Sequence, residues 1–319
     1  MGIFKRICLL ASAVLLGCGG EVLPVGAPPG TPSGFVAADS ARIMDDLRTL
    51  AHDTLEGRRT GEPGNRLARD YIRTGFRRAG LRPPPTGYLQ PFPLPERSSG
   101  DGNPAATGAN VVGWVPGSDP SLGAIVLTAH FDHLGVRDGR IYNGADDNAS
   151  GVAALLSLAR YVARHPLRHT AVFAALDGEE MGLLGARAFL TSGWPENPVL
   201  NLNMDMVSRS DSLLVVAGTH HYPRLRTFLD DLEGSPPVVL EFGYDEPGVE
   251  GRPDWTRSSD HGVFHERGIP FLYFGVEDHE DYHRPTDDFE KVDRAFFIGA
   301  VRTVLAATLT LDEELAAHR

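Results

Sequence analysis

The chain has 319 residues, of which 42% are hydrophobic and 23% charged, as in ordinary globular proteins. Its 30 Lys and Arg residues stand against 42 Asp and Glu, so the net charge is -12. An acidic surface repels phosphate backbones, and this balance argues against nucleic acid as a partner. The length allows one large α/β domain or two small ones.

The first residues predict an export signal. Lys5 and Arg6 precede an apolar run over residues 7–16, which is too short to span a bilayer. The run ends at Gly17-Cys18 and resembles a bacterial lipoprotein signal, in which the Cys becomes the lipidated first residue of the mature chain. We therefore expect removal of residues 1–17 and an exported protein held by Cys18 at the outer membrane or cell surface. A plain secretory signal is the alternative.

The cysteine content limits the chemistry of the mature chain. The two cysteines are Cys8 and Cys18, and Cys8 lies in the segment that we expect to be removed. The mature chain then has no disulfide and no thiolate metal site, so any metal must be held by His, Asp and Glu. Residues 18–36 are rich in Gly, Pro and Ala and predict a flexible tether. Residues 37–319 are expected to form a single domain.

The hydrophobic pattern of that domain alternates between helical and extended segments. Two amphipathic helices are expected between residues 39 and 80, followed by a Pro- and Gly-rich surface loop over 81–109. Nearly continuous apolar runs predict buried strands at residues 124–129, 171–176, 199–206, 213–217 and 269–274. Helices are expected at residues 152–162, 183–190, 222–232 and 296–309, and a long loop at residues 243–259, at the rim of a site. Strands that are apolar throughout and separated by helices predict a mostly parallel sheet covered on both faces, a three-layer αβα sandwich.

Polar residues follow two of these strands directly. The strand 124–129 leads into His130-Phe131-Asp132, and ligands bind beyond the carboxyl ends of strands in open α/β sheets. A metal-ligating His is commonly oriented by a carboxylate, although a structural His is the alternative. The strand 171–176 leads into Glu179 and Glu180. One of these acids can coordinate a metal while the other stays free as a general base, unless the pair is only a solvated acidic turn.

Further candidate ligands lie elsewhere in the chain. Asp146 and Asp147 precede a helix, where they could cap it, or where Asp147 could bridge two cations. Asp205 is placed inside an apolar strand, where an unpaired carboxylate is costly. His283 lies on a polar loop. Two His, two Asp and one Glu can hold two zinc ions with three ligands each if one carboxylate is shared, and three-ligand zinc leaves a position for water.

Together these motifs resemble the co-catalytic zinc exopeptidases, the family of secreted bacterial leucine aminopeptidases, aminopeptidase Y and glutamate carboxypeptidase II. The resemblance rests on five motifs in order, which contain His130, Asp147, Glu180, Asp205 and His283 at successive spacings of 17, 33, 25 and 78 residues. It extends over about residues 38–310, and Ser259-Asp260-His261 and the segment 56–61 match as well. The resemblance implies a zinc-exopeptidase fold and a peptide substrate. His130 and Asp205 would hold one zinc ion, Glu180 and His283 the other, and Asp147 would bridge them.

The resemblance also implies catalytic roles. Glu179 would be the general base that takes a proton from the bridging water and passes it to the leaving amine. Asp132 would orient His130. The peptide bond after Asp147 is expected to be cis.

Two departures from the family pattern qualify these expectations. Several members have a Tyr shortly before the Ser-Asp-His segment that stabilises the oxyanion, whereas this chain has none there; Arg257 and Tyr282 are the candidates. The space between residues 81 and 124 is too short for a protease-associated domain. The principal hypothesis is an aminopeptidase. The alternatives are a carboxypeptidase or dipeptidase of the same family, a one-zinc glutaminyl cyclase, and a binding domain with a dead site, as in the transferrin receptor.

Overall fold

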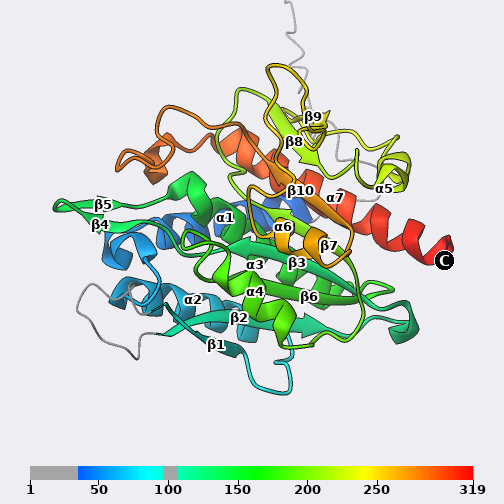
Figure 1. The fold of residues 1–319 in the computed structure, drawn as a ribbon, viewed down its shortest axis with the longest axis horizontal. Helices are drawn as coiled ribbons and strands as arrows, with labels where there is room; N and C mark the ends of the chain where they lie inside the picture. The colour runs from blue at the N-terminus through cyan, green and yellow to red at the C-terminus, as the bar shows by residue number, and fades with distance from the viewer. Residues whose placement is uncertain (1–34, 96–106, 319) are drawn as a thin grey trace, which may run out of the picture.

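The computed structural model describes residues 35–95 and 107–318 (Figure 1). The predicted signal peptide, Cys18 and most of the predicted tether lie outside the described residues. Helix α1 (Phe35–Leu50) begins two residues before the predicted start of the domain at residue 37.

An eight-stranded mixed sheet forms the centre of the domain, in the order β1-β2-β6-β3-β7-β10-β8-β9. The pairs among β6, β3, β7 and β10 are parallel, as is the pair β8 and β9, while β1-β2, β2-β6 and β10-β8 are antiparallel. A separate hairpin joins β4 (Gly135–Arg137) to β5 (Arg140–Tyr142). The strands of the sheet are β1 (Leu89–Pro93), β2 (Thr107–Val115), β3 (Ala124–His130), β6 (Thr170–Leu176), β7 (Pro198–Met204), β8 (Leu213–Ala217), β9 (Val239–Phe242) and β10 (Phe271–Gly275).

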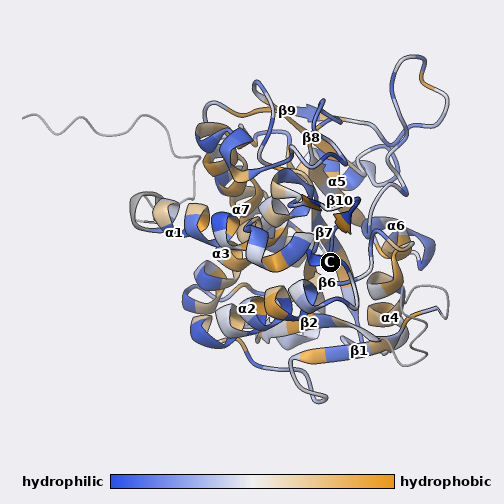
Figure 2. Ribbon diagram, turned by 90° about the vertical axis from the view of Figure 1, so that its left-hand side faces the viewer, coloured by the Kyte–Doolittle hydropathy of each residue, from blue (hydrophilic) through white to orange (hydrophobic). Residues whose placement is uncertain are grey.

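Helices cover both faces of this sheet, as the three-layer prediction requires (Figure 2). One face carries α1, α2 (Pro63–Ala79), α3 (Gly151–Arg164) and α7 (Arg294–Ala317). The other carries α4 (Leu184–Thr191) and α6 (His261–Glu266), and α5 (Pro223–Phe228) packs near the end of α7. Short helical turns occur at Asp53–Arg58, Pro120–Leu122, Ala145–Ser150 and Phe289–Lys291.

The central strands are apolar on both sides because each side meets a helical layer. In β3, Ile125 and Leu127 pack into the larger core under α1, α2, α3 and α7, whereas Ala124 and Val126 pack into the smaller core under α4 and α6. Side chains alternate across a strand, so two buried faces produce a continuous apolar run. Among the described residues, α7 is the helix long and apolar enough to cross a bilayer, and its burial against the sheet is that of a core helix.

The structure corrects two sequence-based expectations. Residues 81–109, expected to be a surface loop, contain β1 and the start of β2, which extend the sheet by two antiparallel strands. The strand β1 was not predicted because Pro91 and Pro93 are typical of loops, although Pro is tolerated on an edge strand. The strand expected to contain Asp205 ends at Met204, so Asp205 is the first residue beyond it.

Candidate metal centre and active site

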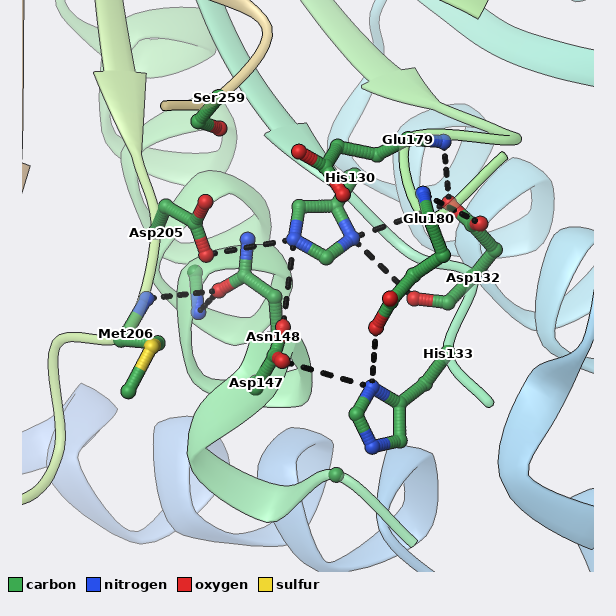
Figure 3. A network of polar contacts seen from close by, with 12 residues as sticks. His130, Asp132, His133, Asp147, Asn148, Glu179, Glu180, Asp205, Met206 and Ser259 are labelled. Carbon is green, nitrogen blue, oxygen red and sulfur yellow. Dashed lines mark hydrogen bonds and ion pairs between the residues drawn. The ribbon is translucent and has the colours of Figure 1, made fainter. Parts of the chain in front are cut away.

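Three neighbouring parallel strands end at the candidate site. His130 is the last residue of β3, Glu179 and Glu180 follow β6, and Asp205 follows β7. β3 pairs in parallel with both β6 and β7, so the carboxyl ends of all three lie at one edge of the sheet. The sheet itself therefore brings these side chains together (Figure 3).

The first cluster of donor atoms is buried, and we call it the inner position. His130 Nε2 lies 3.2 Å from Asp205 Oδ1 and 3.4 Å from Asp147 Oδ1. The side chain of His130 is 2% exposed and that of Asp205 is 11% exposed. These three groups could hold a metal ion.

The second cluster shares Asp147, and we call it the outer position. His283 Nε2 lies 3.1 Å from Asp147 Oδ2 and 3.5 Å from Glu180 Oε2. Asp147 thus directs one carboxylate oxygen to each position. The His283 side chain is 39% exposed, which leaves the outer position more open to solvent than the inner one.

Asp132 holds the turn that carries both glutamates. Its carboxylate accepts the backbone N–H of Glu179 at 3.0 Å and that of Glu180 at 3.3 Å. His130 Nδ1 lies 3.1 Å from the backbone carbonyl of Asp132 and 3.7 Å from its carboxylate. The backbone of residue 132 is therefore nearer to the imidazole than the carboxylate that the sequence assigned to orienting it.

The histidines of the site lower the pKa values of the two carboxylates beside them, those of Asp147 and Glu180. Burial raises the pKa of Asp147, but His133, His130 and His283 bring that pKa well below its ordinary value. Burial likewise opposes ionisation of Glu180, yet contacts with His133 and His283 lower its pKa to about 2. The carboxylates of Asp147 and Glu180 are therefore anionic at neutral pH and available to a cation.

The loop that carries Asp147 is fixed from two directions. The side chain of Asn148 accepts the backbone N–H of Met206 at 3.2 Å and donates to the carbonyl of Met204 at 3.0 Å. The carboxylate of Asp287 accepts the backbone N–H groups of Asp146 and Asp147. The peptide bond between Asp147 and Asn148 is cis, as expected. The carboxylate of Asp147 is thus tied to the segments that carry Asp205 and His283.

A buried arginine, Arg58, joins the end of β3 to the same loop. Its guanidinium donates to the backbone carbonyls of Phe131 at 2.8 Å, Leu50 at 2.6 Å and Gly144 at 2.9 Å. The side chain is 1% exposed, and burial lowers its pKa to about 10, against the pull of Asp147 and other nearby acids. Sequence analysis gave no role to Arg58, because its partners are carbonyl groups that leave no side-chain pattern.

Sequence analysis also missed His133, which lies inside the site. Its Nδ1 lies 2.7 Å from Glu180 Oε1 and 3.6 Å from Asp147 Oδ2 (Figure 3). The residue stands three positions after His130 in the same strand-end turn, and that proximity was the available indication.

The residues present fit a divalent metal. The donors are imidazole nitrogens and carboxylate oxygens without thiolates, the ligand types that zinc accepts in catalytic sites. Glu180 Oε1 and the ring nitrogens of His133 are buried and have no directed hydrogen bond among the described residues. Buried polar atoms normally find partners, and His133, Asp147 and Glu180 together form a second group that could hold a cation.

Comparisons with known proteins agree with this fold. The structure superimposes on a zinc aminopeptidase from Bacillus subtilis with a TM-score of 0.68 at 17% identity, covering 84% of this chain and 94% of that one. It superimposes on the glutaminyl cyclase of Fimbriiglobus ruber with the same TM-score and identity, covering 85% of this chain and 95% of that one. The fold is that of the zinc exopeptidases.

Sequence comparison defines the family. The model of peptidase family M28 matches residues 110–308, and the chain belongs to that family. The alkaline phosphatase isozyme conversion protein of Escherichia coli (strain K12) is 28% identical over 212 residues, which are 62% of this chain and 58% of that protein. A vacuolar membrane protease of Candida albicans (strain WO-1) is 27% identical over 183 residues, 57% of this chain and 20% of that protein. The chain thus matches between a fifth and less than two thirds of the length of these relatives.

Proposed function

We propose that this chain is an aminopeptidase that uses two zinc ions, one at the inner and one at the outer position. The observation that carries the proposal is the spacing of the donor atoms. Tetrahedral zinc with bonds of about 2.0–2.2 Å places its ligand atoms roughly 3.3–3.6 Å apart. The four contacts that His130 and His283 make with their carboxylate partners measure 3.1–3.5 Å, and Asp147 contributes one oxygen to each position.

Glu179 is the proposed general base. Zinc ions, when bound, polarise the substrate carbonyl and lower the pKa of the attacking water. Burial raises the pKa of Glu179 well above its ordinary value, and Asp205 and Asp260 add to this although His130 opposes it. A carboxylate with a raised pKa accepts a proton from water and returns it to the leaving amine. Asp132 supports this role by fixing the turn of Glu179.

Tyr282 is the proposed donor to the oxyanion of the tetrahedral intermediate. Its ring stacks on that of His283 with centroids 3.9 Å apart, which places it beside the outer position. Burial and the carboxylates of Asp147 and Asp205 raise its pKa, so the phenol keeps its proton at neutral pH and remains a donor. Arg257, the other candidate from the sequence, is exposed and lines a surface pocket with His221 and Asp254.

The charge around the site favours a substrate with a free amino terminus. Asp278 is an exposed residue, and its carboxylate interacts electrostatically with His283, Asp147, Asp205 and Tyr282. It lies outside the proposed ligand set, so its negative charge remains when zinc is bound. A negative group at the rim attracts an α-ammonium and repels the terminal carboxylate that a carboxypeptidase must bind.

We further propose that the protein is exported and anchored by a lipid on Cys18. Support comes from the sequence alone, from the basic start, the short apolar run and the Gly17-Cys18 junction. Metabolic labelling with a radioactive fatty acid tests the anchor. Wild-type protein should carry the label and stay with membranes, whereas a Cys18→Ser variant should be unlabelled and released from membranes. A labelled Cys18→Ser variant would exclude Cys18 as the attachment site.

The activity is tested with the soluble form that starts at Gly19. Its substrates are aminoacyl-nitroanilides with a free or an acetylated amino terminus, blocked peptides with a free carboxyl terminus, and peptides that begin with glutamine. We expect cleavage of the free-amine substrates only, loss of activity on chelation, and recovery with zinc.

Each other result redirects the assignment. Cleavage of the blocked peptides at the carboxyl terminus would establish a carboxypeptidase. Cyclisation of the glutaminyl peptides without hydrolysis would establish a cyclase. The matched variant Asp278→Asn should raise KM for the free-amine substrates while leaving zinc content unchanged, and an unchanged KM would remove Asp278 from substrate recognition.

A further inference from the structure

His133 stands in the metal centre without belonging to the proposed ligand set. Its side chain is completely buried, and Nδ1 lies 2.7 Å from Glu180 Oε1. Neither atom makes a hydrogen bond among the described residues, so the contact between them is a close ion pair. A buried imidazole that faces a ligand carboxylate must serve that carboxylate or the ion.

The distances separate these two roles. The proposed ligand pairs are 3.1–3.5 Å apart, near the edge of a zinc tetrahedron, whereas the contact between His133 and Glu180 is 2.7 Å. This shorter distance falls in the range of charge-assisted contacts between nitrogen and oxygen, about 2.7–2.9 Å, and is too short for two ligands of one tetrahedral zinc ion. Glu180 divides its oxygens accordingly, with Oε1 toward His133 and Oε2 toward His283.

The surrounding backbone confines the imidazole of His133. A Cβ added to Gly144 would lie 2.5 Å from Cδ2 of that ring and 2.6 Å from Cγ. The residue at 144 must therefore lack a side chain for the ring to lie where it does. Gly144 also has a φ of 56°, and its carbonyl accepts a hydrogen bond from Arg58, so the wall beside the ring is itself held in place.

We propose that His133 is a positioning residue that holds Oε1 of Glu180 and so directs Oε2 to the outer zinc ion. Partners of this kind, which contact a ligand and not the ion, fix ligand orientation and typically change metal affinity by about 10–100-fold. The inference rests on the proposed two-zinc function. It predicts that loss of the His133 contact weakens the outer ion and leaves the inner ion unchanged.

The test compares His133→Leu with His133→Asn by competitive chelator titration of bound zinc and by the absorption spectrum of the cobalt-substituted protein. The side-chain amide of Asn occupies the place of the imidazole Nδ1 and can donate to Glu180, whereas Leu cannot. We expect His133→Leu to weaken the outer ion by about 10–100-fold, and His133→Asn to restore most of that affinity. Thermal unfolding of both metal-free variants checks that each is folded.

Three outcomes would overturn the inference. Wild-type affinity in a folded His133→Leu variant would show that the contact is idle. Equal loss in both variants, with a changed cobalt spectrum in each, would make His133 a ligand itself. Weakening of the inner ion instead of the outer one would show that His133 acts on the inner position and not on the outer one. Wild-type zinc content, measured first, tests the proposed function separately, because fewer than two ions in the wild type would refute the two-zinc site before any variant is considered.

Discussion

The inner and outer positions share Asp147 but are built from different kinds of structure. The inner position takes His130 and Asp205 from the ends of two central strands, and both side chains are buried. The outer position takes His283 from the loop between β10 and α7, and that side chain is 39% exposed. The sheet thus supplies precision at one position and a loop supplies access at the other, so we expect the substrate to approach from the outer side.

The adjacent residues Glu179 and Glu180 also differ in the position that each one faces. Glu180 contacts His283 at the outer position, whereas the charge of Glu179 is coupled to His130 and Asp205 at the inner position. One turn after β6 therefore serves both positions, with the proposed ligand Glu180 at one and the proposed base Glu179 beside the other.

The largest expected effect is that of Glu179→Gln. Loss of a general base lowers turnover by about 10²–10⁴-fold, and the amide keeps the size of the side chain. Both zinc ions should remain, because Glu179 is assigned to neither. Steady-state kinetics and metal analysis measure the two quantities. Near-normal turnover would refute the role of base, and loss of the inner ion would make Glu179 a ligand and erase the division between the two glutamates.

The next effect separates the two positions directly. Asp205→Ala should reduce zinc from two ions to one, because it removes a buried ligand and leaves His130 and the shared Asp147 as the remaining donors of the inner position. His283→Ala should weaken only the outer ion, and in the wild type the outer ion should leave at a chelator concentration about tenfold or more below that needed for the inner one. Dialysis against graded chelator, followed by metal analysis, tests this order. Simultaneous release of both ions would contradict it.

A smaller effect is expected for Arg58→Lys, which tests the frame that the two positions share. Lysine cannot reproduce the planar fork that reaches several carbonyl groups, so we expect a loss of about 3 kcal/mol in the free energy of unfolding. Arg66→Lys is the matched control, because Arg66 is exposed and donates to the single carbonyl of Gly61. Denaturant unfolding of the zinc-loaded proteins gives both values. Equal effects would show that the guanidinium of Arg58 is not structural.

The smallest effect concerns the layer behind the inner position. The ring of His261 packs at a tilt against that of Tyr273, whose hydroxyl donates to the carbonyl of Asp205. Burial lowers the pKa of His261 to about 4. Between pH 6.5, the ordinary pKa of His, and about pH 4, His261 is protonated in the unfolded chain but not in the folded protein. The free energy of unfolding therefore falls as the pH falls through this range.

His261→Gln removes this titration and keeps a donor for the carbonyl of Trp255, which His261 contacts through Nε2 at 2.7 Å. The stability of the wild type should decline relative to the variant by up to about 1.4 kcal/mol per pH unit in that window. Unfolding of the metal-free proteins across pH 4–8 measures the difference. A constant difference would show that His261 has the same pKa in the folded and unfolded states.

The sequence predicts those parts of the fold and site that follow from local pattern. Apolar runs with polar residues at their ends identified β3, β6 and β7 and the groups after them, because parallel strands deliver such residues to one edge. Asp205 was singled out for a carboxylate inside a strand, yet it lies just past the strand end, where metal ligands usually stand. The free-energy cost of burying an unpaired carboxylate thus identified Asp205 correctly, although the predicted end of the strand was wrong.

Other features depend on contacts that no local pattern encodes. The partners of Arg58 are carbonyl groups up to 86 residues away, and any sequence supplies carbonyl groups. His133 lies in the site because Gly144 leaves space for its ring, a relation visible only when the two segments meet. β1 escaped prediction because its prolines resemble those of a loop, although an edge strand needs hydrogen bonds on one side only.

The hydrogen bonds around the loop of Asp147 have a consequence for how this architecture changes over time. Asn148 and Asp287 anchor that loop through hydrogen bonds to the protein backbone, so part of what fixes its shape comes from groups that are not proposed ligands. A chain with such a frame can lose a ligand to mutation and still fold. Such a frame allows the ligands to change in evolution while the scaffold that presents them stays the same.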